Sequence, residues 1–357
     1  MKKIIFILPF SSKTASSLRL LQFSKEFTNK LIIAPYIDQF GNKTEEKNII
    51  KLKRSLGGFS MIVPLVRIFN KEKPELIVYT KPTIFSVFSC FVYKLLNRHV
   101  KIIADYDEFE PATSYSNNKG IAKIAKPIIH FFIHQLSNLI ATAFIISNKR
   151  ILRFIPKNKP HIYLPNAADP NIIKPAKNKP HKKFSIYYFG NIYKNKQTFS
   201  LLKLSNEIDC QLVFAGKLYS PELKKEFPKV KFLGLYSLKE MSQLASEADI
   251  LIAFFDNTIG NKYTSNMKVF DYMCLQKPII VSDTGELKKY IHYPKGGYVV
   301  KPGDKEGLKK TIEWIRAHPK EAMKKAKYAR KLAETVESWQ ARREKFKKFI
   351  EKILKQS

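Results

Sequence analysis

Cysteine is scarce in this sequence. Cys90, Cys210 and Cys274 are the only three in 357 residues, and each lies inside an apolar run at a spacing that suggests no pair. This usage argues against a disulfide framework and against a zinc site, and it is typical of a protein in a reducing compartment. We therefore expect a cytoplasmic protein without a bound metal.

Acidic residues are also few. The chain has 30 Asp and Glu against 64 Lys and Arg, a formal net charge of +34. Such an excess is compatible with solvated lysines throughout, with an anionic membrane surface, or with nucleic acid. Lysine is spread along the whole chain and no zinc-finger or RNA-binding motif occurs, so we rank these three in that order. We expect no nucleic-acid partner.

Long uninterrupted apolar runs are missing. The run that starts at Met1 ends at Pro9, too short for a signal peptide, and predicts a first buried strand instead. Between Lys126 and Lys149 no formal charge occurs, but polar residues such as His130 and His134 interrupt the segment. We interpret it as a helix over 128–137 and a buried strand over 140–146.

A basic amphipathic segment precedes Pro127. It places Lys119, Lys123 and Lys126 beside Ile121 and Ile124. Such a surface is compatible with an anionic bilayer, although a packed helix with a solvated lysine edge is the more frequent outcome. A peripheral position on the inner face of the cell membrane is therefore retained as a hypothesis.

Glycine is unevenly distributed. Nine of the 13 glycines lie at or beyond Gly190, so the second half of the chain is the better place for close backbone approach to a ligand. Short apolar runs alternate with helical patterns in both halves, which predicts parallel α/β sheets. Residues 171–183 are rich in Pro, Lys and Asn, the composition of an interdomain linker.

The segment 259–290 is the most informative part of the chain. A polar loop leads into a helical pattern, Lys277-Pro278 ends that helix, and a short buried strand and a polar turn follow. Ligands of parallel α/β sheets lie at such strand ends and helix N-termini. Lys268, in the first helical turn, suits a phosphate, and Asp271, one turn on, suits sugar hydroxyls.

Residues 265–283 read SNMKVFDYMCLQKPIIVSD. This run resembles the nucleotide-sugar site of GT-B glycosyltransferases of family 4, whose pattern is roughly S-P-x-K-x-F-E-Y-M-A-x-G-K-P-V-I-x-S-D. Asn266, Asp271 and Gln276 replace the Pro, Glu and Gly of that pattern. Many relatives carry a second acid eight positions before Asp271, where this chain has Tyr263.

The resemblance implies further donor-site residues. Relatives often have Gly-Arg-x4-Lys on the donor diphosphate, and here Gly190 and Lys196 keep their places while Asn191 replaces the Arg. Lys196 and Lys268 would stabilise the leaving diphosphate, and Asp271 would orient the ribose or the sugar. The remaining expected contacts with the nucleotide-sugar are Gly216, Gly234, Leu235, Ser265, Asn266 and Met267.

The first half carries the expected acceptor side. The acidic cluster 105–110 follows a predicted strand over 100–104. Its Asp-x-Asp spacing is also found in metal sites of another glycosyltransferase architecture, GT-A. In family 4 this place often reads His-Asp, and here Tyr106 stands for the His while Asp107 matches the Asp, which the resemblance makes catalytic. Candidate residues on the acceptor side are Ser16, Ser17, Arg19 and Tyr106.

The resemblance implies an α/β protein of GT-B fold, with two Rossmann-like domains whose parallel sheets face a cleft. We expect domains at 1–170 and 184–335, the linker between them, and a terminal helix over 336–357 that crosses back to the first domain. The implied activity is transfer of a sugar, with retention and without a metal or cofactor, from a UDP- or GDP-sugar to a hydroxyl of a glycan or polyprenyl-linked glycan. The alternatives are a GT-B-like phosphorylase or epimerase and a catalytically impaired nucleotide-sugar-binding protein.

Overall fold

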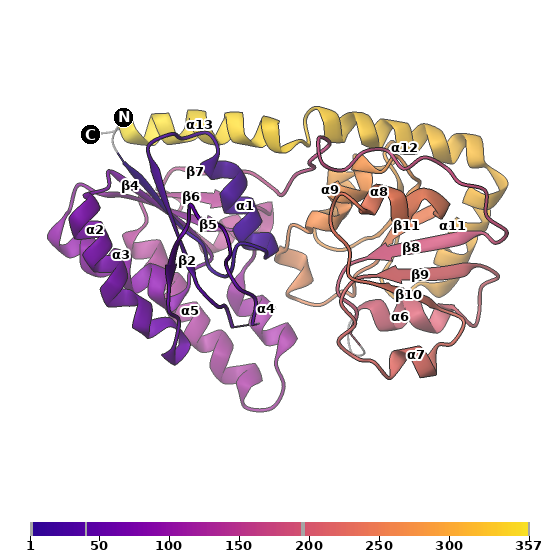
Figure 1. The fold of residues 1–357 in the computed structure, drawn as a ribbon, viewed down its shortest axis with the longest axis horizontal. Coiled ribbons are helices and arrows are strands. Elements are labelled where there is room, and N and C mark those ends of the chain that lie inside the picture. Colours follow the sequence, from indigo (N-terminus) through magenta and orange to yellow (C-terminus); the bar gives the residue numbers. More distant parts are fainter. Residues whose placement is uncertain (1–2, 40, 194–196, 356–357) are drawn as a thin grey trace. The chain divides into compact units, whose positions relative to one another are not determined.

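The computed structural model describes residues 3–39, 41–193 and 197–355, and for 197–200 only the backbone. The chain forms two compact units. Unit 1 comprises residues 1–166, 263–265 and 342–357, and unit 2 comprises residues 167–262 and 266–341. Each unit is built on its own parallel sheet (Figure 1).

The sheet of unit 1 has seven strands in the order β3-β2-β1-β4-β5-β6-β7, and every neighbouring pair is parallel. Its strands are β1 (Ile4–Ile7), β2 (Lys30–Pro35), β3 (Ile50–Leu52), β4 (Leu76–Thr80), β5 (Lys101–Tyr106), β6 (Ala143–Ile146) and β7 (His161–Tyr163). The central strands are runs of Ile, Val, Phe and Ala that are buried on both faces, as a sheet covered by helices on both sides requires.

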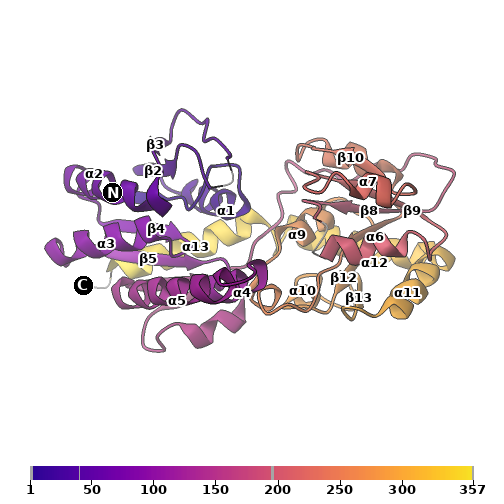
Figure 2. The ribbon, with the colours of Figure 1, turned by 90° about the horizontal axis from the view of Figure 1, so that it is seen from below.

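Helices cover both faces of this sheet (Figure 1). One face carries α2 (Ile62–Glu72), α3 (Ile84–Leu96) and α5 (Ala122–Ile140), which lie side by side and share one hydrophobic core (Figure 2). The other carries α1 (Ala15–Ser24) and the last part of α13 (Trp339–Lys355), where Phe23 stacks on Phe346 at 4.7 Å. The helix α4 (Glu110–Asn117) packs on α5, and short 3-10 helices occupy Leu56–Met61 and Lys149–Phe154. A third, Asn261–Tyr263, has only its last residue in unit 1.

Two elements of unit 1 differ from the sequence prediction. β5 includes Asp105 and Tyr106, which pair with Ile145 and Ile146 of β6, so these two residues belong to the strand and not to the loop after it. The segment around Pro127 forms one helix, α5, rather than two, because a proline near the start of a helix removes only one backbone hydrogen bond.

The sheet of unit 2 has six parallel strands in the order β10-β9-β8-β11-β12-β13. They are β8 (Ser185–Phe189), β9 (Gln211–Ala215), β10 (Lys231–Gly234), β11 (Ile250–Ala253), β12 (Ile279–Ser282) and β13 (Tyr298–Val300). In both units the strand order reverses beside the first strand, which is the doubly wound, Rossmann-like arrangement predicted from the sequence.

Alternate residues of these strands face two cores. Tyr187 and Phe189 pack on the side of α8 (Met241–Leu244), α9 (Met267–Cys274), α10 (Leu287–Tyr290) and α12 (Pro319–Glu334). Ile186 and Tyr188 pack on the side of α6 (Gln197–Leu204), α7 (Leu223–Glu226) and α11 (Lys305–Ala317). A short 3-10 helix, Ala245–Glu247, completes the unit. Among the described residues, no helix combines the length and apolar character needed to cross a membrane.

Candidate functional site

Three glycines mark the carboxyl ends of β8, β9 and β10. The Gly190 amide donates to the Ala215 carbonyl at 2.8 Å, and the Gly216 amide donates to the Gly234 carbonyl at 2.6 Å. A Cβ on Gly216 would lie 2.0 Å from the Gly190 oxygen, and both Gly190 and Gly216 have a φ of +143°. Only glycine allows backbones to meet this closely in that conformation, so the strand ends form a floor without side chains.

Lys268 lies directly over this floor. Asn266 caps α9 by accepting the Lys268 amide at 3.2 Å, which fixes the first turn of the helix. The Lys268 Nζ donates to the Tyr188 hydroxyl at 2.6 Å and lies 4.2 Å from the centre of that ring. A Cβ on Gly190 would be 2.6 Å from the Nζ, so the absent side chain of Gly190 is what makes room for the ammonium.

The surroundings of Lys268 are mostly apolar, with the Phe255 ring at 5.3 Å from the Nζ. Burial lowers the pKa of Lys268 from 10.5 to about 7, against the opposing effect of Asp271. Burial also raises the pKa of Asp271 to about 7, helped by Asp169 and opposed by Lys268. A bound anion would stabilise the charged form of a lysine that is held in this way beside a helix N-terminus. A diphosphate is such an anion.

Four other residues were predicted to contact the sugar donor: Asn191, Leu235, Met267 and Lys196. The Asn191 side chain is exposed, and its carbonyl accepts from the Tyr188 hydroxyl at 3.2 Å. Leu235, after the last residue of β10, is 78% exposed, and Met267 is half-buried at the start of α9. Lys196 lies outside the described residues.

Ser265 lies in unit 1 rather than in unit 2. It is buried there, where its hydroxyl accepts from the Asn166 backbone amide at 2.9 Å and its carbonyl accepts from the Asn166 side chain at 2.5 Å. Its contact with the nucleotide stays a prediction.

Unit 1 gathers a second polar centre at the carboxyl ends of β4 and β5. Lys81 follows β4, and its Nζ forms ion pairs with Glu108, with Glu110 at 2.6 Å and with Asp107 at 3.8 Å. Lys81 has a φ of +60°, an uncommon conformation for a residue with a side chain. The hydroxyl of Ser16, in the first turn of α1, donates to Asp107 at 2.5 Å, which brings these two predicted residues together.

This centre holds more carboxylates than cations. Burial raises the pKa of Asp107 to about 6, opposed by Lys81, and raises the pKa of Glu110 to about 8. Burial also acts on Glu108, but its ion pair with Lys81 keeps the pKa of that carboxyl below the ordinary value. The Asp107 Oδ1 has no hydrogen-bond partner. Near neutral pH the cluster therefore contains carboxyl groups that can both donate and accept hydrogen bonds.

Lys81 and Glu110 were missed in the sequence. Their signal was present, because both are polar residues that follow a strand and such residues meet at one edge of a parallel sheet. The residue type alone does not mark Lys81 as a site residue, because Lys-Pro after an apolar run also fits an ordinary solvated turn.

Three residues predicted on the acceptor side make contacts inside unit 1. Arg19 is fully buried, with its Nε 2.9 Å from Asp105 and a terminal nitrogen 2.6 Å from the Leu164 carbonyl. Tyr106 is fully buried and its hydroxyl hydrogen-bonds Ser137 at 2.7 Å. The Ser17 hydroxyl is buried and donates to the Phe10 carbonyl at 3.2 Å. These contacts stabilise unit 1, and the acceptor-side role of the three residues stays a prediction.

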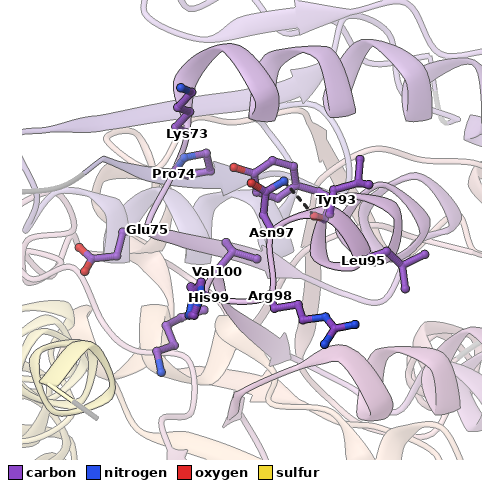
Figure 3. Close-up of a pocket in the computed structure, with 11 residues that line it drawn as sticks. Lys73, Pro74, Glu75, Tyr93, Leu95, Asn97, Arg98, His99 and Val100 are labelled. Atoms are coloured by element: carbon purple, nitrogen blue, oxygen red, sulfur yellow. Dashed lines mark hydrogen bonds between the residues drawn. The ribbon is translucent and has the colours of Figure 1, made fainter. Parts of the chain in front are cut away.

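A cavity of about 200 Å³ lies beside the polar centre of unit 1. Lys81, Glu110 and His130 line it on one side, with Phe10, Ile129 and Ile133 among its apolar walls. A larger cavity of about 600 Å³ lies at the amino ends of β4 and β5, between Lys73 and Lys101 (Figure 3). None of the predicted site residues lines the larger cavity, and ligands of parallel sheets bind at the opposite, carboxyl ends. Within the described parts of the chain, no three His, Cys, Asp or Glu side chains are grouped as metal ligands.

Comparison with known proteins agrees with the fold. Residues 183–318, most of unit 2, match the family described as glycosyl transferases group 1. The chain is also similar over its whole length to the solved sucrose-phosphate synthase of Thermosynechococcus elongatus (TM-score 0.79, 15% identity, 100% of both chains). No curated protein matches at a significant level.

Two further solved structures are similar. They are HepE of Anabaena in complex with UDP-glucose (TM-score 0.77, 14% identity, 99% of this chain and 100% of that chain) and a glycosyltransferase of Rickettsia africae (TM-score 0.74, 14% identity, 100% of both). At such identities the likeness concerns the fold, and the predicted GT-B class is confirmed. The match over residues 183–318 confirms the prediction of a glycosyltransferase.

Proposed function

We propose that this chain, whose residues 183–318 form a glycosyl transferases group 1 domain, moves a sugar from a UDP- or GDP-sugar to a hydroxyl of an acceptor. The reaction would retain the configuration of the sugar and need neither metal nor cofactor. The single observation that carries the proposal is the ammonium of Lys268 over the glycine floor at the end of β8.

Lys268 would bind the diphosphate of the donor. Negative charge grows on that group as the sugar leaves, so a fixed ammonium in apolar surroundings stabilises the transition state more than the ground state. The Gly190 and Gly216 backbones would let the phosphates come close to the strand ends. Lys196 would supply a second cation. Asp271, as a protonated carboxyl group or as a carboxylate, would orient a hydroxyl of the ribose or the sugar.

The donor base is the least constrained part of the proposal. Gly234 and the exposed Leu235 follow directly along the glycine floor, which makes them our candidates for contact with the base. The similar structure of HepE contains UDP-glucose, which favours UDP-sugars as the first donors to test.

The polar centre of unit 1 would bind the acceptor. Its cavity combines the carboxyl group of Glu110, the cations of Lys81 and Arg54, and apolar walls, and sugars are bound by such mixtures of hydrogen-bonding and apolar surface. Asp107, with a raised pKa and an Oδ1 that has no hydrogen-bond partner, would accept the hydrogen of the attacking hydroxyl. We propose a glycan or a polyprenyl-linked glycan as acceptor, with the protein in the cytoplasm on the inner face of the membrane.

A thermal-shift panel of UDP-, GDP-, ADP- and CMP-sugars, each with and without EDTA, tests the donor and the metal question together. We expect one nucleotide to raise the melting temperature and EDTA to have no effect. Lys268→Ala should lose the shift and the transfer activity, whereas Lys239→Ala, at an exposed lysine of the same unit, should keep both. Full transfer activity in Lys268→Ala would contradict the proposal.

A catalytically impaired nucleotide-sugar-binding protein is the second candidate. Tyr263, where many relatives of the predicted family carry an acid, is buried against Phe109 and Phe154 at ring distances of 5.6 and 5.4 Å. Such a protein would show the thermal shift but no turnover. Product analysis separates the remaining alternative, because a phosphorylase or epimerase releases a sugar phosphate or an epimer instead of a new glycoside.

A further inference from the structure

The helix α5 carries a continuous apolar stripe on its outward face. The stripe consists of five large side chains, which we call the α5 ridge: Ile121, which caps the start of α5, and Ile124, Ile128, Phe132 and Leu139 within it. Their exposed fractions are 87, 67, 51, 67 and 71%. Spacings of three, four and seven residues place them on one side of a helix, over a length of about 27 Å. A helix on the surface of a soluble protein normally turns such a stripe inward.

The ridge cannot rotate inward, because the opposite side of α5 is already packed. Ile133 and Ile140 belong to the core of unit 1. Near the start of the helix, the Lys123 Nζ lies 4.7 Å from the centre of the Tyr115 ring of α4, and the Lys126 Nζ donates to Asn118 at 3.0 Å. The orientation of α5 is therefore fixed by two sets of contacts, and the ridge is a permanent part of the surface (α5 is labelled in Figure 2).

The surroundings of the ridge are basic. No acidic residue occurs in the sequence between Glu110 and Asp169. The same interval contains eight basic residues: Lys119, Lys123, Lys126, Lys149, Arg150, Arg153, Lys157 and Lys159. At the carboxyl end of α5 the Lys159 Nζ donates to the Leu139 carbonyl at 2.9 Å, and the Lys94 Nζ donates to the Ile140 carbonyl at 2.6 Å. Lysines thus flank both ends of the ridge.

We propose that the α5 ridge lies in the surface of an anionic lipid bilayer. Apolar side chains along one face of a helix, with lysines at its ends and no Asp or Glu in the helix itself, are the features of an interfacial membrane-binding helix. A second copy of the chain fits less well, because it carries the same large excess of basic residues and would be repelled from this lysine-flanked helix. The helix lies on the membrane rather than spanning it, since no described helix has the character of a span.

Membrane binding would bring the bilayer close to the polar centre of unit 1. Ile129 of α5 is half exposed near the ridge, and Ile129, His130 and Ile133 also line the cavity of about 200 Å³. A membrane-attached acceptor would therefore have a short path to Lys81 and Glu110. This consequence rests on the proposed function, whereas the binding of the bilayer itself does not.

Co-sedimentation of the full chain with lipid vesicles tests the inference. Vesicles of phosphatidylcholine are compared with vesicles that contain about one third phosphatidylglycerol. We expect binding to the anionic vesicles only, weakened by high salt. The triple variant Ile121→Ser, Ile128→Ser, Phe132→Ser should lower the partition coefficient at least about tenfold. The matched control is Ile172→Ser, Ile259→Ser, Val336→Ser, at exposed apolar residues of unit 2, and should bind as the parent does.

A second pair of variants tests how much the basic charge contributes to membrane binding. Lys119→Glu, Lys123→Glu, Lys126→Glu should weaken binding at least about tenfold. Three charge reversals of the same kind at Lys320, Lys327 and Lys331, which are exposed on α12, should weaken vesicle binding clearly less.

Vesicle binding that the ridge variant leaves unchanged would overturn the inference, as would equal binding to neutral vesicles. A dimer in sedimentation velocity that the ridge variant dissociates would assign the ridge to a second copy instead. Circular dichroism of each variant checks that α5 is folded, and donor thermal shifts, which do not depend on lipid, show separately whether the proposed function stands.

Discussion

Replacing Lys268 by methionine is expected to make unit 2 more stable. The lysine is charged in the unfolded chain up to a pH near 10.5, but burial lowers its pKa in the folded protein to about 7. The charge on Lys268 therefore lowers the free energy of unfolding, with the full effect below pH 7. This destabilisation disappears as the pH rises from 7 to 10.5. Methionine can pack against Tyr188 and Phe255 and carries no charge, although it gives up the Nζ hydrogen bond to Tyr188.

The size of the effect follows from the pKa shift. A change from 10.5 to about 7 is 3.5 pH units, which at 1.36 kcal/mol per unit sets an upper limit of about 5 kcal/mol. Partial exposure of the side chain and the loss of its cation–π contact, about 1 kcal/mol, reduce this figure. We expect a gain of about 1–2 kcal/mol at pH 6, or about 2–6 °C in the melting temperature.

Thermal unfolding of the parent and of Lys268→Met at pH 6 and pH 10 measures this effect. The gain should be present at pH 6 and nearly gone at pH 10. Lys239→Met, at an exposed lysine of the same unit, should change neither value. A variant less stable than the parent at pH 6, or a gain that is the same at both pH values, would refute the inference that burial disfavours the charged form of Lys268.

Three other outcomes follow from the structure. Gly190→Ala should abolish nucleoside diphosphate binding in calorimetry, since its Cβ would lie 2.6 Å from the Lys268 Nζ, while Gly303→Ala, at a φ of +82° with open space around it, should bind normally. Arg19→Met should lower the free energy of unfolding by about 3–5 kcal/mol in urea, because it leaves Asp105 buried without its partner. Adding Asp105→Leu should recover part of that loss, and strictly additive losses would argue against the ion pair. Finally, the dissociation constant of the diphosphate should rise by up to about tenfold per pH unit above pH 7, since Lys268 must be protonated to bind it, and a flat profile from pH 6.5 to 9 would speak against this.

The fold was predictable because its signals are local. Buried parallel strands appear as short continuous apolar runs, and the segment around Lys268 carries the spacing of a helix that starts at a strand end. The placement of Lys268 and Asp271 one turn apart on α9, with Asn266 as the cap, follows directly from that spacing, and the glycines at 190, 216 and 234 mark successive strand ends. These features needed no knowledge of long-range contacts.

The polar centre of unit 1 was predictable only in part. Lys81 meets the acidic cluster because β4 and β5 are neighbours in the sheet, with Thr80 opposite Asp105, and that register is invisible in the sequence. Tyr106 ends β5 and Arg19 lies in α1, and a polar residue at such a place has the same sequence pattern whether it faces a cavity or the core. Their burial is visible only in the structure.

The most direct test of the central idea, a diphosphate held by Lys268 over Gly190, is a calorimetric comparison of a nucleoside diphosphate with its parent nucleoside. The base is the one that raises the melting temperature most in the donor panel. We predict that the parent protein binds the diphosphate at least about a hundredfold more tightly than the nucleoside, the factor expected when two charge-assisted contacts are gained. In Lys268→Met most of this preference should vanish while nucleoside binding persists. A parent protein that binds both compounds equally, or a Lys268→Met variant that keeps the full preference, would contradict the assignment.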